Sequence, residues 1–250
     1  MSANALANLP WPASTKLLRA PGCVGCLPIG ATEAHGPHLP LGTDVFLSVE
    51  LAERVVTALE GQRPALVLPP ISYSVTRYAA GFAGTIGVSP ESARGLIVDI
   101  LAAVHRHGLA TVALINSHLE PDHVALLDSV ADECRPPDWP RVVFVNHCRK
   151  PWALELGDEF KSGDCHAGAY ETSLLLASRY AEHVRTDAAA RLEPRYVGLV
   201  RQMKSGVRSF EAMGAADAYF GDPARATAEE GERLWGVQVR MWVEAIAECT

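Results

Sequence analysis

The segment 28–44 constrains the fold most strongly, because its glycines and prolines prevent it from forming a regular helix. These residues are Gly30, Gly36, Pro37, Pro40 and Gly42. The same segment carries three side chains of the kinds that bind divalent cations, namely Glu33, His35 and Asp44. We therefore interpret the segment as a metal-binding loop.

The position of this loop supports that interpretation. The loop follows an apolar run, 23–29, that is typical of a buried strand, and it precedes a helical pattern over 45–59. In open α/β sheets, ligands bind at the carboxyl ends of the strands. The alternative is a solvated turn in which Asp44 caps the following helix and the histidines have no role.

Composition limits the class of protein. The chain has 250 residues, of which 48% are hydrophobic and 20% are charged, and it predicts one α/β domain over residues 1–250. A net charge of −7 without a cluster of Lys and Arg argues against nucleic acid and anionic membranes as partners.

We expect a cytoplasmic protein, because no membrane-spanning apolar run and no signal peptide is evident. The six cysteines fit free thiols, with Cys23 and Cys26 in the core.

Beyond the loop, short apolar runs alternate with helical patterns. Strands are expected over 65–68, 111–115 and 141–145, and helices over 11–20, 89–108, 124–134, 174–180 and 227–246. The connection 71–87 is long, rich in hydroxyl groups and punctuated by glycines. Loops of this length in compact domains usually serve a function, so we interpret it as a pocket wall with Ser74 as a candidate substrate-binding residue.

A second pair of potential ligands follows the strand 111–115. His118 and Glu120 are two residues apart, which places both side chains on the same side of an extended segment. Glu33 and His35 have the same spacing after their own strand. A single histidine at a strand end is often a hydrogen-bonded structural residue, but the repetition favours two ligand pairs that face one site.

A third candidate cluster lies at or just before the start of the helix 174–180. It contains His166 and Glu171. The ordinary pKa of histidine lies near neutral pH, so His166 is the best candidate for proton transfer. Glu171 has an alternative role, because an acidic residue near a helix N-terminus interacts favourably with the helix dipole.

The donor set indicates two metal ions. Glu33, His35, Asp44, His118 and Glu120 are too many ligands, with too many carboxylates, for one four-coordinate zinc with an open position. Mixed imidazole and carboxylate ligands suit zinc or manganese. A carboxylate that bridges two ions allows a water or hydroxide to be held between them with a lowered pKa, and such sites hydrolyse amides or phosphate esters.

These motifs resemble those of the creatininase family of metal hydrolases. The resemblance runs from about residue 24 to residue 180 and rests on Glu33-Ala34-His35-Gly36-Pro37-His38-Leu39-Pro40 with Thr43-Asp44, Asn116-x-His118-x-Glu120, and His166-x-Gly168-x-x-Glu171-Thr172-Ser173. It implies a three-layer α/β/α sandwich with a mainly parallel sheet. It also implies a binuclear site that holds Zn²⁺ together with Zn²⁺ or Mn²⁺, and a homo-oligomer, often a hexamer in this family.

The resemblance also implies a role for each ligand. One ion would be held by Glu33 and His118, and the other by His35 and Glu120. Asp44 would bridge the two ions. The catalytic residues would be His166, which transfers the proton, and Glu171, which supports the site.

Departures from creatininase itself lie around the expected pocket. Cys165 and Ser162 stand where that enzyme has a glutamate and a tryptophan, and Leu119 stands in place of a tyrosine. Trp152 is the candidate match for a pocket tryptophan and a candidate substrate-binding residue. Because of these departures, we expect an amidohydrolase that acts on a small cyclic amide or a formamide through a metal-bridging hydroxide, rather than on creatinine in particular.

Three alternatives remain open on the sequence. A peptidase that trims a short modified peptide, as in mycofactocin maturation, would use the same site. A metal-binding protein without activity is a second alternative. A phosphoesterase is a third, but we expect no basic residues near the motifs to hold a phosphate.

Overall fold

The computed structural model describes residues 4–249, which are built around one parallel sheet. The strands of this region follow the order β2–β1–β3–β4. They are β1 (Val24–Ile29), β2 (Ala65–Val67), β3 (Thr111–Asn116) and β4 (Arg141–Val143). Every residue of β1 and β3 is buried, as expected for parallel strands that are covered on both faces.

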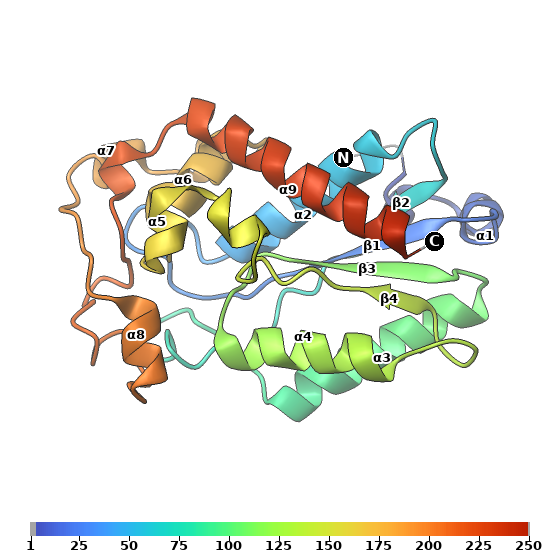
Figure 1. Ribbon diagram of the computed structural model, residues 1–250, viewed down its shortest axis with the longest axis horizontal. Coiled ribbons are helices and arrows are strands. Elements are labelled where there is room, and N and C mark those ends of the chain that lie inside the picture. Colours follow the sequence, from blue (N-terminus) through green and yellow to red (C-terminus); the bar gives the residue numbers. More distant parts are fainter. Residues whose placement is uncertain (1–3, 250) are drawn as a thin grey trace.

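Helices cover both faces of the sheet and produce three layers (Figure 1). One face carries α2 (Thr43–Ala58), α6 (Ala169–Leu176) and α9 (Ala228–Glu248), which pack on one another, with α2 directly on β1. The other face carries α3 (Pro90–Arg106) and α4 (Pro121–Glu133), which pack together. A separate apolar core lies on each side of the sheet. The predicted α/β/α sandwich with a parallel sheet is confirmed.

The register of the two central strands brings the predicted ligand loops together. β1 and β3 are neighbours, and Ile29 at the end of β1 pairs with Asn116 at the end of β3. Both strands therefore end at the same level of the sheet. The loop 30–42 and the segment 117–120 leave the sheet side by side, which is where α/β folds place their sites.

Two helices begin earlier than the sequence pattern predicts. α4 begins at Pro121, because proline suits the first position of a helix, and α6 begins at Ala169. Glu171 therefore lies inside the first turn of α6 rather than before it. Side chains cap two of the helices, since Ser89 accepts a hydrogen bond from the Ser92 amide and Thr227 accepts one from the Glu230 amide.

Short helices complete the chain. They are α1 (Trp11–Leu18), α5 (Gly157–Ser162), α7 (Thr186–Ala189) and α8 (Leu199–Lys204), with 3₁₀ turns η1 (Leu6–Asn8), η2 (Trp152–Leu154), η3 (Ala181–His183) and η4 (Pro223–Arg225). In Figure 1, α5, α7 and α8 lie together at the left-hand end of the molecule, the end from which α4 starts.

Two further expectations can be compared with the structure. All six cysteines are free, and Cys23 and Cys26 are buried in the core as predicted. Within residues 4–249, no helix is both long enough and apolar enough to cross a membrane.

Candidate metal centre

Seven polar side chains converge beyond the carboxyl ends of β1 and β3, and all except His166 are buried. They come from the loop after β1 (Glu33, His35), the start of α2 (Asp44), the segment after β3 (His118, Glu120) and the region around the start of α6 (His166, Glu171). Their ligand atoms form three sets in which all atoms lie within 4.8 Å of one another, namely Glu33 with His118 and Glu120, His35 with Asp44 and Glu171, and Glu33 with His35 and His166.

Asp44 stands between two of the histidines. Its Oδ1 atom lies 3.3 Å from Nε2 of His35, and its Oδ2 atom lies 3.1 Å from Nδ1 of His118. The α2 N-terminus has no side-chain cap, so the alternative role of Asp44 as a helix cap is wrong. A carboxylate whose two oxygens face two different imidazoles is placed to bridge two cations.

Backbone carbonyls fix the orientation of each histidine ring. Nε2 of His118 lies 2.8 Å from the Val75 carbonyl, Nδ1 of His35 lies 3.1 Å from the Glu33 carbonyl, and Nε2 of His166 lies 3.0 Å from the Ala34 carbonyl. A carbonyl only accepts, so these nitrogens carry the proton. In the deprotonated ring that can bind a metal ion, the opposite nitrogen then presents a lone pair on the side of the carboxylates. Metal-binding histidines are commonly held in this way.

The centre brings four carboxylates and three imidazoles together, and these groups shift one another's pKa values. Burial alone would raise the pKa of Glu33, yet the neighbouring His118 lowers it to about 2. Burial alone would lower the pKa of His35, yet Asp44, Glu171 and Glu33 raise it to about 10. Burial, reinforced by Asp44 and Glu33, raises the pKa of Glu171 to about 8 against the opposing effect of His35. Carboxylates buried this close together are stabilised by bound protons or by metal cations among them.

Unpaired atoms point to the same requirement. Among residues 4–249, the buried atoms without a hydrogen-bond partner include His35 Nε2, Asp44 Oδ2 and Glu120 Oε1. All three belong to the donor cluster. The residues therefore fit divalent cations that prefer mixed imidazole and carboxylate ligands, such as Zn²⁺ or Mn²⁺.

The grouping of the donors differs from the expected pairing in one respect. Glu120 lies with Glu33 and His118, rather than with His35. The place beside His35 is taken by Glu171, whose Oε2 atom lies 3.6 Å from His35 Nε2. The reason is the early start of α6, which brings its first turn against the loop after β1. Glu171 is thus a donor in its own right, as well as an acceptor from the Ala167 amide at 2.6 Å.

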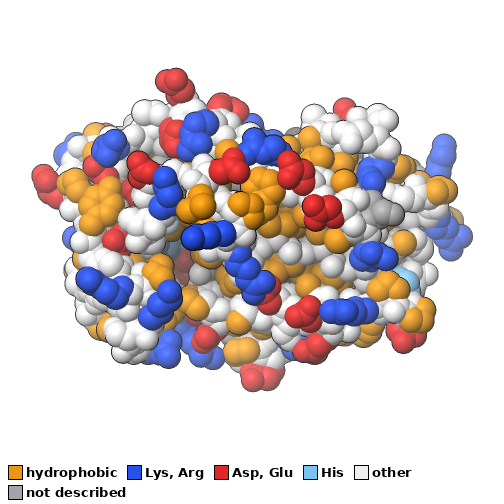
Figure 2. All heavy atoms as spheres, in the orientation of Figure 1, with side chains coloured by type: hydrophobic (Ala, Val, Ile, Leu, Met, Phe, Trp, Pro, Cys, Tyr) orange, Lys and Arg blue, Asp and Glu red, His pale blue; other side chains and the backbone are white. Residues whose placement is uncertain are grey.

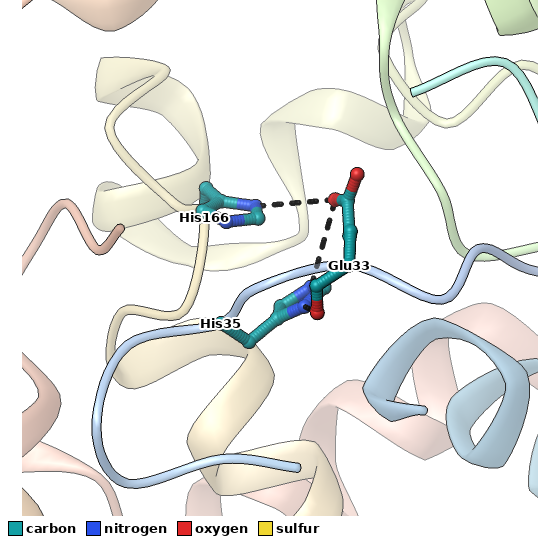
Figure 3. A group of neighbouring side chains, drawn as sticks. All are labelled: Glu33, His35 and His166. Carbon is teal, nitrogen blue, oxygen red and sulfur yellow. Dashed lines mark hydrogen bonds and ion pairs between the residues drawn. The ribbon is translucent and has the colours of Figure 1, made fainter. Parts of the chain in front are cut away.

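His166 lines the cavity. Figure 3 shows its ring pointing toward the Glu33 carboxylate, beside His35. Its Nδ1 atom is 3.8 Å from Oε1 of Glu33, and its ring centroid is 4.4 Å from that of His35. Burial and the charge on His35 lower its pKa to about 4. A neutral imidazole at this position can accept a proton from one group and donate it to another.

The loop 71–87 holds the donors in place. Thr76 donates a hydrogen bond to Glu33 Oε2, and Glu120 Oε2 accepts from the amides of Arg77 at 2.7 Å and Tyr78 at 3.3 Å. Ser74, the candidate substrate-binding residue of this loop, does not line the cavity, and its hydroxyl donates to the Gly30 carbonyl at 2.6 Å. The loop therefore supports the centre through its backbone and hydroxyl groups, and only its Tyr78 side chain reaches the cavity.

All the donors except His35 line the floor of a cavity of about 440 Å³. Its walls are largely apolar and come from α5, α8 and nearby loops; they include Tyr78, Phe160, Leu199, Met203 and Phe210. Part of this wall, from Leu199 to Phe210, lies in the segment 184–221, where a weak hydrophobic period predicts no regular element. Leu119, Ser162 and Cys165, the departures from creatininase, all line the same cavity.

Two expectations about this pocket are corrected. Trp152 does not line the cavity, because it packs against the core under α9, with the Arg240 guanidinium 5.8 Å from its ring centroid. The expected lack of basic residues is also wrong, since Lys150 and Lys161 both line the cavity. Figure 2 shows Lys and Arg side chains around a hollow on this face, in the region between α5 and α8.

Comparison with known proteins agrees with this geometry. A family model described as creatininase, creatinine amidohydrolase, matches residues 7–246. The mycofactocin precursor peptide peptidase of Mycobacterium ulcerans (strain Agy99) is 31% identical over 241 residues, covering 90% of this chain and 84% of that protein. Creatinine amidohydrolase of Pseudomonas putida is 28% identical over 268 residues, covering 96% and 95%.

Solved structures agree over the whole fold. A manganese creatininase and a zinc–zinc creatininase variant match with TM-scores of 0.76 and 0.77, each at 26% identity and covering 99% of this chain and 98% of the other. The family match spans both the sheet and every donor of the centre. The chain therefore belongs to the creatininase family of metal-dependent hydrolases.

Proposed function

We propose that this protein hydrolyses the amide C–N bond of a small cyclic amide or a formamide. The observation that carries the proposal is the position of Asp44, whose two oxygens face His35 and His118 at the floor of an apolar cavity. Two divalent ions, Zn²⁺ with Zn²⁺ or Mn²⁺, would supply Lewis acidity and an activated water when bound there. Glu33, His118 and Glu120 would hold one of them, His35 and Glu171 the other, and Asp44 both.

The chain itself would supply proton transfer and shielding. His166 lines the cavity beside the donors, and its ring lies 4.6 Å from that of Phe210. Its Nδ1 atom is free of backbone contacts because Nε2 is held by the Ala34 carbonyl. Nδ1 would therefore take up the proton that the attacking water releases and deliver it to the departing nitrogen. The apolar wall would limit water around the polarised carbonyl and strengthen the electrostatic interactions.

A hydrolysis screen tests this proposal. The purified protein, supplied with zinc or manganese, would be tested on creatinine, formamides, cyclic imides and p-nitrophenyl phosphate, beside the Asp44→Ala and His166→Ala variants. We expect turnover of one amide class that both variants lose. Turnover of the phosphate ester alone, or turnover that Asp44→Ala retains, would contradict the proposal.

A second candidate is the amide bond of a short peptide. The relatives of known activity include a mycofactocin precursor peptide peptidase, and the cavity mouth exposes apolar side chains suited to a peptide, with Leu154 52% exposed and Val200 41% exposed. The same screen decides between the two candidates if short peptides are added. Cleavage of peptides without turnover of formamides or cyclic imides would favour this second candidate.

A further inference from the structure

The cavity has a charge pattern that the hydrolytic centre does not use. All the acidic side chains that line it belong to the donor cluster. Apart from the donors and His166, its charged lining residues among residues 4–249 are Lys150 and Lys161. Both lysines are exposed, whereas the donors are buried. The lysines therefore lie at the open end of the cavity, and the carboxylates lie at its floor.

Lys150 is available to bind an anion. The adjacent Arg149 is paired with Asp128 at 2.8 Å, but Lys150 has no ion pair or hydrogen bond with a described residue. Lys161 lies 2.5 Å from Asp158, whose side chain is 98% exposed. Exposed pairs of this kind are weak and are screened by salt, so Lys161 can also turn toward a ligand.

The surface between the lysines and the donors is apolar. Leu154 and Val200 line the mouth and are exposed, while Phe160 and Leu199 line the cavity and are buried. A molecule that reaches the floor must therefore present apolar groups to this wall. The lysines at the mouth would attract an anionic group on that molecule. The buried carboxylates at the floor would repel the same group when no metal ions are bound.

We propose that the substrate carries a free carboxylate, which Lys150 binds at the cavity mouth with assistance from Lys161. An apolar segment of the substrate then lies along the apolar cavity wall, and its amide group reaches the donors at the cavity floor. N-acyl amino acids and short peptides with a free carboxyl terminus have this form. The inference rests on the proposed amide hydrolysis and specifies its substrate class. A carboxylate suits isolated ammonium groups, whereas the forked contacts that arginine makes with phosphate are missing from the described cavity lining.

Matched substrates test the inference. The probes are N-formyl-leucine with N-formyl-leucinamide, and leucyl-leucine with its carboxamide, so that each pair differs only in the carboxylate. We expect the wild-type protein to favour the carboxylate member by about tenfold or more in kcat/KM, the range for a hydrogen bond to a charged group. Added NaCl should reduce this preference through KM.

Variants identify the residue responsible. Lys150→Met should reduce the ratio between the two members of a pair by about tenfold, mainly through KM, and Lys150→Arg should keep most of the preference. Lys204→Met is the matched control, because Lys204 is an exposed lysine of α8 that does not line the cavity. Equal rates for both members, or a ratio that Lys150→Met leaves unchanged, would overturn the inference.

Failure of the inference differs from failure of the proposed function. Turnover of amides without a carboxylate preference overturns only the substrate class. If the metal-loaded protein cleaves no amide, calorimetry with N-formyl-leucine and N-formyl-leucinamide still tests the lysine. The inference is supported if the wild type binds N-formyl-leucine more tightly than N-formyl-leucinamide and Lys150→Met, at equal metal content, loses this difference. It is overturned if the wild type and Lys150→Met bind N-formyl-leucine equally well.

Discussion

Nδ1 of His118 lies 3.1 Å from Oδ2 of Asp44. The other ring nitrogen of His118, Nε2, donates to the Val75 carbonyl, so in the neutral ring Nδ1 is an acceptor, as is the carboxylate oxygen that it faces. Two acceptors at this distance are stable only with a positive charge between them, which a proton or a metal cation can supply. The strand register explains how they meet, because the residues come from loops that leave neighbouring strands at the same level. This contact is the core of the two-ion account.

His166→Gln tests proton transfer. The neutral imidazole beside Glu33 is the group placed to move a proton, so its loss should lower kcat by about 10² to 10⁴. The bound metal should be retained, since Asp44 and the other donors are intact. The measurement is steady-state kinetics with metal analysis of the same sample. His183→Gln is the control, because His183 is exposed and does not line the cavity. Equal losses of kcat in the two variants would show that His166 does not transfer the proton.

Thr76→Val tests the support given by the loop 71–87. Thr76 donates to one oxygen of Glu33, and residues that orient metal ligands typically contribute about 10- to 100-fold to metal affinity. We expect a loss in this range in competitive titration with a chelator. Thr57→Val, at an exposed position of α2, should leave the affinity unchanged. An unaltered affinity in Thr76→Val would show that the hydrogen bond does not position Glu33.

Gly30→Ala tests the close approach of the ligand loop to α2. A Cβ atom at this position would lie 2.4 Å from the Val45 amide nitrogen. This atom belongs to the backbone of α2, so the clash can be relieved only by a shift of the helix or of the loop. We expect a loss of about 1–3 kcal/mol in the free energy of unfolding, together with weaker metal binding because Asp44 would shift. Gly95→Ala is the control, since nothing lies within 4 Å of its Cβ and it lies within a helix. The control should be neutral or stabilising; similar urea midpoints for both variants would contradict this packing argument.

His147→Phe tests acid sensitivity. Burial lowers the pKa of His147 from 6.5 to about 4, so between these values the unfolded chain binds a proton that the folded chain does not. Its contribution to stability is complete above pH 6.5 and is lost as the pH falls toward 4, by about 1.4 kcal/mol for each pH unit. Urea unfolding of His147→Phe should therefore lose less stability over this range than the wild type. Equal pH slopes for the two proteins would contradict the role of His147.

The predictable part of the fold and of the centre rests on local chemistry. The glycine- and proline-rich segment 28–44 could only be a loop, and its donors together with His118 and Glu120 follow the ends of apolar strands. Parallel strands collect such loops at one edge of the sheet, so these residues could be brought together without coordinates.

The remaining features depend on tertiary packing. The position of Glu171 beside His35 follows from where α6 begins, and the contacts of Thr76 depend on the path of an irregular loop. Lys150 and Lys161 are separated in sequence from the first motifs and reach the cavity only through the fold. Homo-oligomeric assembly stays a prediction, and light scattering of the purified protein would test it.

Elemental analysis of the purified protein is the most direct test of the two-ion centre. The wild-type protein, loaded with zinc or manganese and freed of excess metal, should contain about two ions per chain, because Asp44 faces a histidine from each of two donor sets. Asp44→Ala should bind fewer ions under the same conditions, since it removes a ligand of both. One ion or none in the wild type, or two ions retained by Asp44→Ala, would contradict the account.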